Sequence, residues 1–146
     1  MGELLYPCAM SLLASLCFGV IFQISGKKLL FAGFNGMIGW LVYLLCATPF
    51  PESVIPRYFC ATLAITLFAE WCARWLRAPV SVFLAIGLIP LVPGSGIYQT
   101  MLYCIRGQTA QALRECVGTV GIAGALAMGV VVVSSLVGLF TAKRRR

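Results

Sequence analysis

Long apolar runs separated by short polar turns constrain the fold of this chain more than any other feature. Each run approaches or exceeds the roughly 20 residues that a helix needs to cross the hydrocarbon core of a bilayer. The runs cover residues 7–24, 29–48, 56–76, 79–105 and 112–140. Since 61% of the residues are hydrophobic and only 10% are charged, we predict an all-α integral membrane protein with about five transmembrane helices, in which residues 1–146 form a single transmembrane domain.

The residue types that are scarce argue against an enzyme. The chain has four acidic residues and no histidine, so the usual groups for metal ligation and general acid–base chemistry are few. Its seven cysteines form no CxxC pair and are interpreted as small apolar side chains. We therefore predict no enzymatic activity, no catalytic residue, no metal site and no cofactor. The cations behind the net charge of +7 lie between the apolar runs, which argues against nucleic acid as a partner.

The distribution of these cations predicts the orientation of the chain. With five crossings and the N-terminus outside, eight of the eleven Lys and Arg residues lie on the inner side and three on the outer side. The inner set comprises Lys27, Lys28, Arg74, Arg77 and the four C-terminal cations, and the outer set comprises Arg57, Arg106 and Arg114. A re-entrant loop in place of the fourth crossing gives six against five, so five crossings with a cytoplasmic C-terminus are preferred.

The fourth run is interrupted by two prolines and two glycines within residues 90–96. A regular helix does not pass through such a segment, because proline lacks a donor and clashes with the preceding turn. As one helix, the 27 residues of 79–105 would reach about 40 Å, beyond the roughly 30 Å hydrocarbon core. We predict two half-helices with a bent joint. The joint must face a protein interior or a wet cavity, because lipid offers its backbone groups no partner.

The joint is the candidate substrate site. Ser95 is expected to N-cap the second half-helix and to leave the N–H groups of Gly96, Ile97 and Tyr98 free. The positive end of the helix dipole would then attract a carboxylate within the membrane. The substrate-binding candidates are Pro90, Pro93, Gly94, Ser95, Gly96, Tyr98 and Gln99, with Thr100 in the same turn. The alternative is that the prolines and glycines only kink the helix for packing.

A polar helix end supplies a second candidate. Glu70, Arg74 and Arg77 follow one another at i, i+4 and i+7, a spacing that pairs Glu with Arg on one helical face. In one interpretation they form an interfacial anchor, whose arginines extend to the membrane surface beside two tryptophans. In the other, Glu70 takes up and releases a proton during transport.

Small and polar residues within the runs predict contacts between helices. Gly121, Ala125 and Gly129 repeat at steps of four residues and form a stripe that another helix can approach closely. Asn35 lies among the glycines of the second run. It is either a hydrogen-bonding residue between helices or a polar group that faces a pore.

Several motifs resemble the threonine/serine exporter (ThrE) family. They are Pro-Val-Ser-Val-Phe at 79–83, Ile-Pro-Leu-Val-Pro-Gly-Ser-Gly-Ile-Tyr at 89–98, Phe-Gly-Val-Ile-Phe at 18–22 and Gly-Met-Ile-Gly-Trp at 36–40. The chain is most similar to the small YjjB-type subunit of the split, two-component form of this family. The resemblance covers nearly the whole chain.

The resemblance implies a function and a setting. It implies a subunit of a secondary exporter of small carboxylate-bearing metabolites, either threonine and serine or succinate, driven by the membrane potential or the proton gradient. It also implies a bacterial inner membrane and a larger YjjP-like membrane subunit as partner, in a complex that can itself oligomerise. The alternative is a non-transporting structural or assembly subunit of a membrane complex.

Overall fold

The computed structural model describes residues 2–144, with side chains described for residues 5–139, and every element in this part of the chain is helical. The elements are α1 (Gly2–Ile21), α2 (Lys27–Leu45), α3 (Val54–Leu76), α4 (Val80–Leu88), the 3-10 turn η1 (Ile89–Leu91), α5 (Gly94–Ile105) and α6 (Thr109–Arg144). This order confirms the predicted all-α class. The side chains of the four C-terminal cations in the predicted inner set lie outside the described residues.

The lengths of the helices agree with a multi-pass membrane protein. Among the described residues, α2, α3 and the Thr109–Leu139 part of α6 are long and apolar enough to cross a bilayer. The α4–η1 segment and α5 together form a bent apolar pair, long enough for either a fourth, broken span or a re-entrant loop. The apolar stretch Leu5–Ile21 of α1 is shorter. α6 has 36 residues, about 54 Å at 1.5 Å per residue, so it must tilt or extend beyond a hydrocarbon core of roughly 30 Å.

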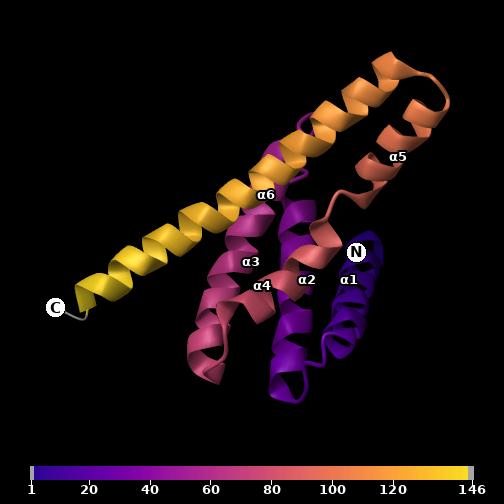
Figure 1. Ribbon diagram of the computed structural model, residues 1–146. Helices are drawn as coiled ribbons and strands as arrows, with labels where there is room; N and C mark the ends of the chain where they lie inside the picture. Colours follow the sequence, from indigo (N-terminus) through magenta and orange to yellow (C-terminus); the bar gives the residue numbers. More distant parts are fainter. Residues whose placement is uncertain (1, 145–146) are drawn as a thin grey trace.

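α2 lies at the centre of the fold, where it packs against α1, α3 and α4 (Figure 1). α6 crosses α3 obliquely, and α5 folds back along the first part of α6. Among the described helices, α5 makes extensive contact with α6 alone. The chain therefore consists of a bundle of α1 to α4 from which the α5–α6 hairpin projects.

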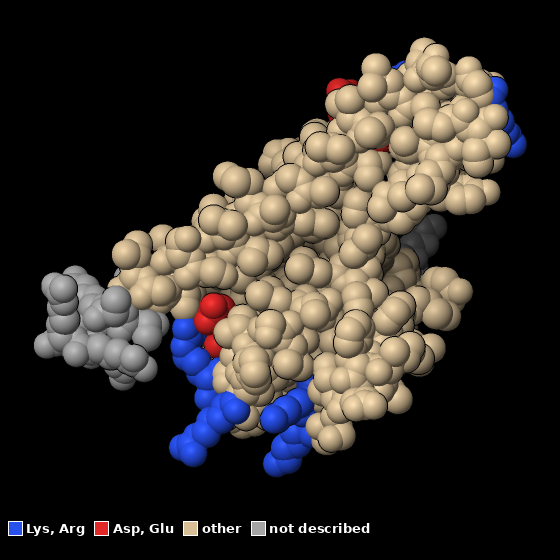
Figure 2. Space-filling view, viewed as in Figure 1, with Lys and Arg blue, Asp and Glu red and all other residues tan. Residues whose placement is uncertain are grey.

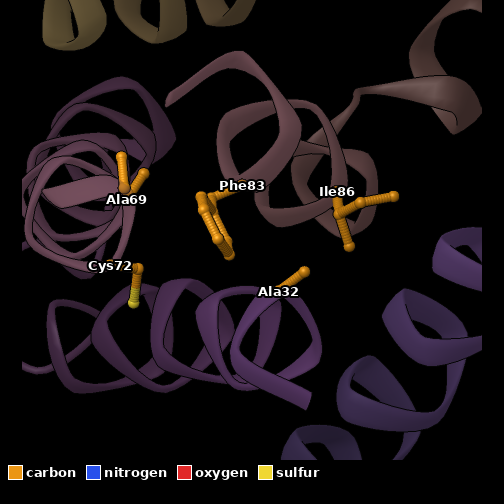
Figure 3. Close-up of a cluster of buried hydrophobic side chains, with 6 residues drawn as sticks. Ala32, Ala69, Cys72, Phe83 and Ile86 are labelled. Atoms are coloured by element: carbon orange, nitrogen blue, oxygen red, sulfur yellow. The ribbon is translucent and has the colours of Figure 1, made fainter. Parts of the chain in front are cut away.

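Small residues allow the short helix α4 to approach both α2 and α3. Phe83 and Ile86 of α4 are fully buried, and they lie in one cluster with Ala32 of α2 and with Ala69 and Cys72 of α3 (Figure 3). The small side chains leave room for the Phe83 ring between the helices. Such close packing is what holds helices together in lipid, where burial of apolar surface brings no advantage over contact with the lipid tails.

Asn35 joins α2 to α4. Its side chain is fully buried, and its Nδ2 donates a hydrogen bond to the carbonyl oxygen of Phe83 at 2.9 Å. A Cβ atom at Gly87 would lie 2.9 Å from Cγ of Asn35, so a glycine on α4 makes room for the amide. Of the two interpretations of Asn35, the hydrogen bond between helices is confirmed.

The predicted small-residue stripe on α6 packs against α3. A Cβ atom at Gly129 would lie 2.8 Å from Cβ of Thr62, and one at Gly121 would lie 3.2 Å from Cδ1 of Ile55. Ala125, between the two glycines, is buried. The stripe therefore sets the close approach of α3 and α6, and its predicted packing role is confirmed.

The described charges gather toward the two ends of the molecule (Figure 2). Lys27 and Lys28 begin α2, while Arg74 and Arg77 end α3, so these four cations share one end. The start of α3 and the turn between α5 and α6 lie toward the opposite end. The four cations that the sequence assigns to the inner side and that the structure describes are thus on one side.

Gly129→Leu and Gly124→Leu form a matched pair of variants on α6. A Cβ atom at position 129 meets Thr62 and the carbonyl oxygen of Phe59, whereas nothing lies within 4 Å of one at position 124. Because overpacking costs roughly 1–3 kcal/mol, we expect Gly129→Leu to lower the free energy of unfolding by that amount relative to Gly124→Leu. Thermal unfolding of both variants in one detergent measures the difference, and equal stabilities would contradict the α3–α6 contact.

Candidate functional site

Two prolines break the fourth span. Pro90 lies in η1 and Pro93 directly precedes α5, and neither can donate a backbone hydrogen bond. The chain leaves the helix at Val92, whose ψ is 127°, far from the helical value near −42°. The two halves, Val80–Leu91 and Gly94–Ile105, are bent by 52°. The predicted break between two half-helices is therefore confirmed.

The prediction that Ser95 caps the second half-helix is wrong. α5 begins at Gly94 with Pro93 as its N-cap, and no side chain caps it. The Pro93 carbonyl accepts the Ile97 N–H at 3.2 Å, and the Gly94 N–H donates to the carbonyl of Val92 at 2.7 Å. The first helical turn therefore starts two residues earlier than a Ser95 cap would allow, because the proline supplies the first carbonyl acceptor.

Because α5 starts at Gly94, the free backbone N–H groups of its first turn include those of Ser95 and Gly96. Within the described part of the chain, neither backbone N–H has a hydrogen-bond acceptor, as is usual in the first turn of a helix. Gly96 was among the predicted donors, whereas Ile97 is bonded and Tyr98 lies where intrahelical bonds begin. The start of α5 thus presents two adjacent N–H groups at the positive end of a helix dipole.

A cavity of about 690 Å³ lies against these donors, a size within the range of small-molecule sites. Its walls are the first turns of α5, the start of α3 with the loop before it, and the first half of α6. Its polar lining comprises Ser95, Gln99 and Tyr103 of α5, Glu52, Ser53 and Tyr58 around the start of α3, and Glu115 and Thr119 of α6. The joint therefore faces a cavity with polar walls, as its unpaired backbone requires.

Gly96 allows α5 and α6 to meet at the wall of this cavity. A Cβ atom at position 96 would collide with the side chain of Thr119. The Thr119 hydroxyl donates to the carbonyl oxygen of Glu115 at 2.7 Å, and the Thr100 hydroxyl donates to that of Gly96 at 2.8 Å. This close approach places the Glu115 carboxylate on the same cavity as the free N–H groups of α5.

The cavity brings together four of the predicted substrate-binding residues, namely Pro93, Ser95, Gly96 and Gln99. Pro90 instead lines a separate cavity of about 290 Å³ between α1, α2 and η1. Gly94 and Tyr98 are exposed, and neither lines these two cavities. The predicted substrate-binding residues therefore do not form one site, although all of them come from one short segment.

Glu52 and Glu115 belong to the cavity but were not singled out in the sequence. Glu52 lies in the loop before α3 and is exposed, whereas Glu115 on α6 is partly buried. A signal for Glu115 was present, because it lies inside the apolar run 112–140, where a carboxylate is expensive. Only the folding of the loop brings Glu52 to the cavity. Since the described lining residues include no Lys or Arg, the cavity is acidic.

Glu70 lies near the other end of α3, away from this cavity. Its Oε2 forms an ion pair with Nη2 of Arg74 at 3.0 Å, and its side chain is 14% exposed. Trp71 and Trp75 stack with ring centroids 5.9 Å apart, and Phe31 meets Trp75 edge-on. The structure therefore contains the predicted pair and the aromatic neighbours of an interfacial anchor. A role of Glu70 in proton transfer stays a prediction.

Comparison with known proteins identifies one family. A family model described as "Threonine/Serine exporter, ThrE" matches residues 7–136. This range includes both half-helices and every described residue that lines the larger cavity. No curated protein and no solved structure gives a significant match.

The contact between Gly96 and Thr119 predicts how firmly α5 docks on α6. We compare Gly96→Val with Gly94→Val, because a Cβ atom collides with Thr119 at position 96 and meets nothing within 4 Å at position 94. If overpacking costs about 1–3 kcal/mol, amide hydrogen exchange in α5 becomes at least several-fold faster in Gly96→Val. Mass-spectrometric hydrogen exchange on the purified variants measures this, and equal protection in both would show that α5 does not depend on the contact.

Proposed function

Because the chain belongs to the threonine/serine exporter family, we propose that it is a transport subunit of a secondary exporter in a bacterial inner membrane. It works with a larger YjjP-like subunit and moves small carboxylate-bearing metabolites out of the cell. The observation that carries this proposal is the single cavity on which the free N–H groups of α5 and the carboxylate of Glu115 both lie.

The start of α5 binds the carboxylate of the substrate. The free N–H groups of Ser95 and Gly96 can donate to its oxygens, and the helix dipole favours a negative charge at this position. This arrangement needs no fixed cation within the membrane, where Lys or Arg is costly. Gln99, one turn further along α5, lies on the same cavity and supplies an additional polar group for the substrate.

Glu115 and Glu52 favour an amino acid over a dicarboxylate. An amino acid carries an ammonium group, for which a carboxylate is a strong charge-assisted acceptor. The second carboxylate of succinate would instead approach the two glutamates with no Lys or Arg among the described lining residues to offset the repulsion. We therefore assign threonine and serine as the preferred substrates, with Glu115 as the main ammonium acceptor because it is the less exposed of the two acids.

The charges at the ends of the bundle orient the transport path. The end with Lys27, Lys28, Arg74 and Arg77 faces the cytoplasm by the positive-inside rule, so the cavity at the opposite end opens outward. The described conformation then corresponds to the state that releases substrate. In the inward-facing state α5 moves relative to the bundle, since among the described helices it makes extensive contact with α6 alone.

The larger subunit covers the hairpin. No residue of α5 is buried, and Met101 and Ile105 are 63% and 85% exposed. α5 also carries the free N–H groups, which lipid cannot satisfy at membrane depth. A protein partner that closes this side of the cavity meets both requirements.

Efflux from proteoliposomes of controlled orientation tests the proposed function. We expect labelled threonine and serine to leave vesicles that contain both subunits, faster with a proton gradient than without it, and succinate to leave more slowly. This chain alone should give no flux. Absence of flux from a complex shown to be assembled would favour the structural-subunit alternative, and faster export of succinate would overturn the substrate assignment.

Glu115→Gln and Glu70→Gln separate the two acidic candidates. Loss of a hydrogen bond to a charged group costs about 1.5–3 kcal/mol, so Glu115→Gln should reduce kcat/KM for threonine by about tenfold to a hundredfold. An i,i+4 ion pair on a helix contributes about 0.3–0.5 kcal/mol, so Glu70→Gln should change transport less than about fivefold. Gel filtration of both assembled complexes is the control. The reverse ranking would support proton transfer by Glu70 instead.

A further inference from the structure

Two cysteines meet where α2 ends and α3 begins. Cys46 is the C-cap residue of α2, and Cys60 lies in the second turn of α3. Both are free thiols and are partly buried. The two side chains lie close enough to interact electrostatically across the helix pair.

The register of α2 and α3 independently places these residues at the same level of the helix pair. In two antiparallel helices, facing residues have numbers with a nearly constant sum. Phe31 and Trp75 meet with ring centroids 5.2 Å apart, and their numbers add to 106, as do those of Cys46 and Cys60. The contacts of Gly39 with Ile65 and of Tyr43 with Tyr58 give 104 and 101, so the sum for Cys46 and Cys60 falls within the range found along the pair.

The cysteine pair lies at the end of the bundle opposite Lys27, Lys28, Arg74 and Arg77. In the orientation given under the proposed function, on which this step rests, that end faces outward. Disulfides form and persist in the oxidising environment outside the cytoplasm. The geometry and the compartment therefore both favour oxidation of this pair.

We propose that Cys46 and Cys60 form an intrachain disulfide at the outer end of α2 and α3. The oxidant is a protein or small molecule that carries a reactive disulfide. One cysteine loses its proton and its thiolate attacks this disulfide, which forms a mixed disulfide and releases one thiol of the oxidant. The second cysteine, as thiolate, then displaces the other sulfur. One S–S bond forms in the chain, and the oxidant gains two electrons and two protons as its dithiol.

The disulfide would constrain one wall of the transport cavity. The ring that it closes runs from Cys46 to Cys60 and contains Glu52, Ser53 and Tyr58, which all line the cavity. Closing such a loop restricts the freedom of the chain between the linked residues. The bond thus holds the wall that bears Glu52 against the end of α2, whatever substrate the cavity binds.

Intact mass measurement of the wild-type chain tests the disulfide and needs no substitution that could disturb folding. Cells that express the chain are quenched with N-ethylmaleimide, and the chain is purified and weighed before and after reduction and a second alkylation. We expect five adducts before reduction and seven after it, since the chain has seven cysteines. Peptide mapping should then find the cross-link between the peptides of Cys46 and Cys60.

Single serine variants identify the pair. Cys46→Ser and Cys60→Ser should each carry six adducts both before and after reduction. Cys104→Ser is the matched control, since Cys104 on α5 is an exposed free thiol, and it should carry four adducts before reduction and six after it. A covalent dimer that depends on Cys46 in a non-reducing gel would overturn the intrachain assignment.

The remaining outcomes separate the disulfide from the proposed function. Seven adducts from cells, and again after treatment of the purified chain with copper phenanthroline, would overturn the proposal. If the disulfide forms in the purified chain with copper phenanthroline but is absent in cells, the proposal of a native disulfide is overturned. That result would also contradict the outward orientation of this end. An intact disulfide in an assembled complex without flux would reject the proposed function and leave the disulfide standing.

Discussion

The unpaired backbone between η1 and α5 is the constraint on which the rest of the structure depends. Pro90 and Pro93 remove two donors from the fourth span, and the first turn of α5 leaves the N–H groups of Ser95 and Gly96 without acceptors in the described residues. Lipid cannot bind these groups. In the structure α5 packs along α6, and the break therefore lies beside a polar cavity.

Close packing of small residues makes this arrangement possible throughout the chain. Gly129 brings α6 against α3, Gly96 brings α5 against α6, and Gly87 admits the Asn35 amide between α2 and α4. In each case a missing side chain lets two backbones approach. The same principle positions the site, since the walls of the cavity come from three helices that meet through these contacts.

The distribution of charge gives the fold a direction. Cations collect at one end of the bundle, where Arg74 pairs with Glu70 beside exposed tryptophans. The structure describes the side chains of two further glutamates, Glu52 and Glu115. Both line the cavity toward the opposite end. A cationic, tryptophan-flanked end and an acidic cavity are therefore separate regions of one small chain, and α3 connects them.

The sequence by itself determined the helical class, the approximate positions of the apolar helices, the break within residues 79–105 and the packing stripe of Gly121, Ala125 and Gly129. These properties depend on local hydropathy, on the missing N–H of proline and on helical periodicity, which act within a few turns. Only the tertiary structure decided that Pro93 rather than Ser95 is the N-cap of α5, that Glu115 and Glu52 share a cavity with its free donors, and that Cys46 and Cys60 lie at the same end of α2 and α3. Those relations depend on how helices rotate and cross, and residues far apart in the chain carry no local signal of that geometry.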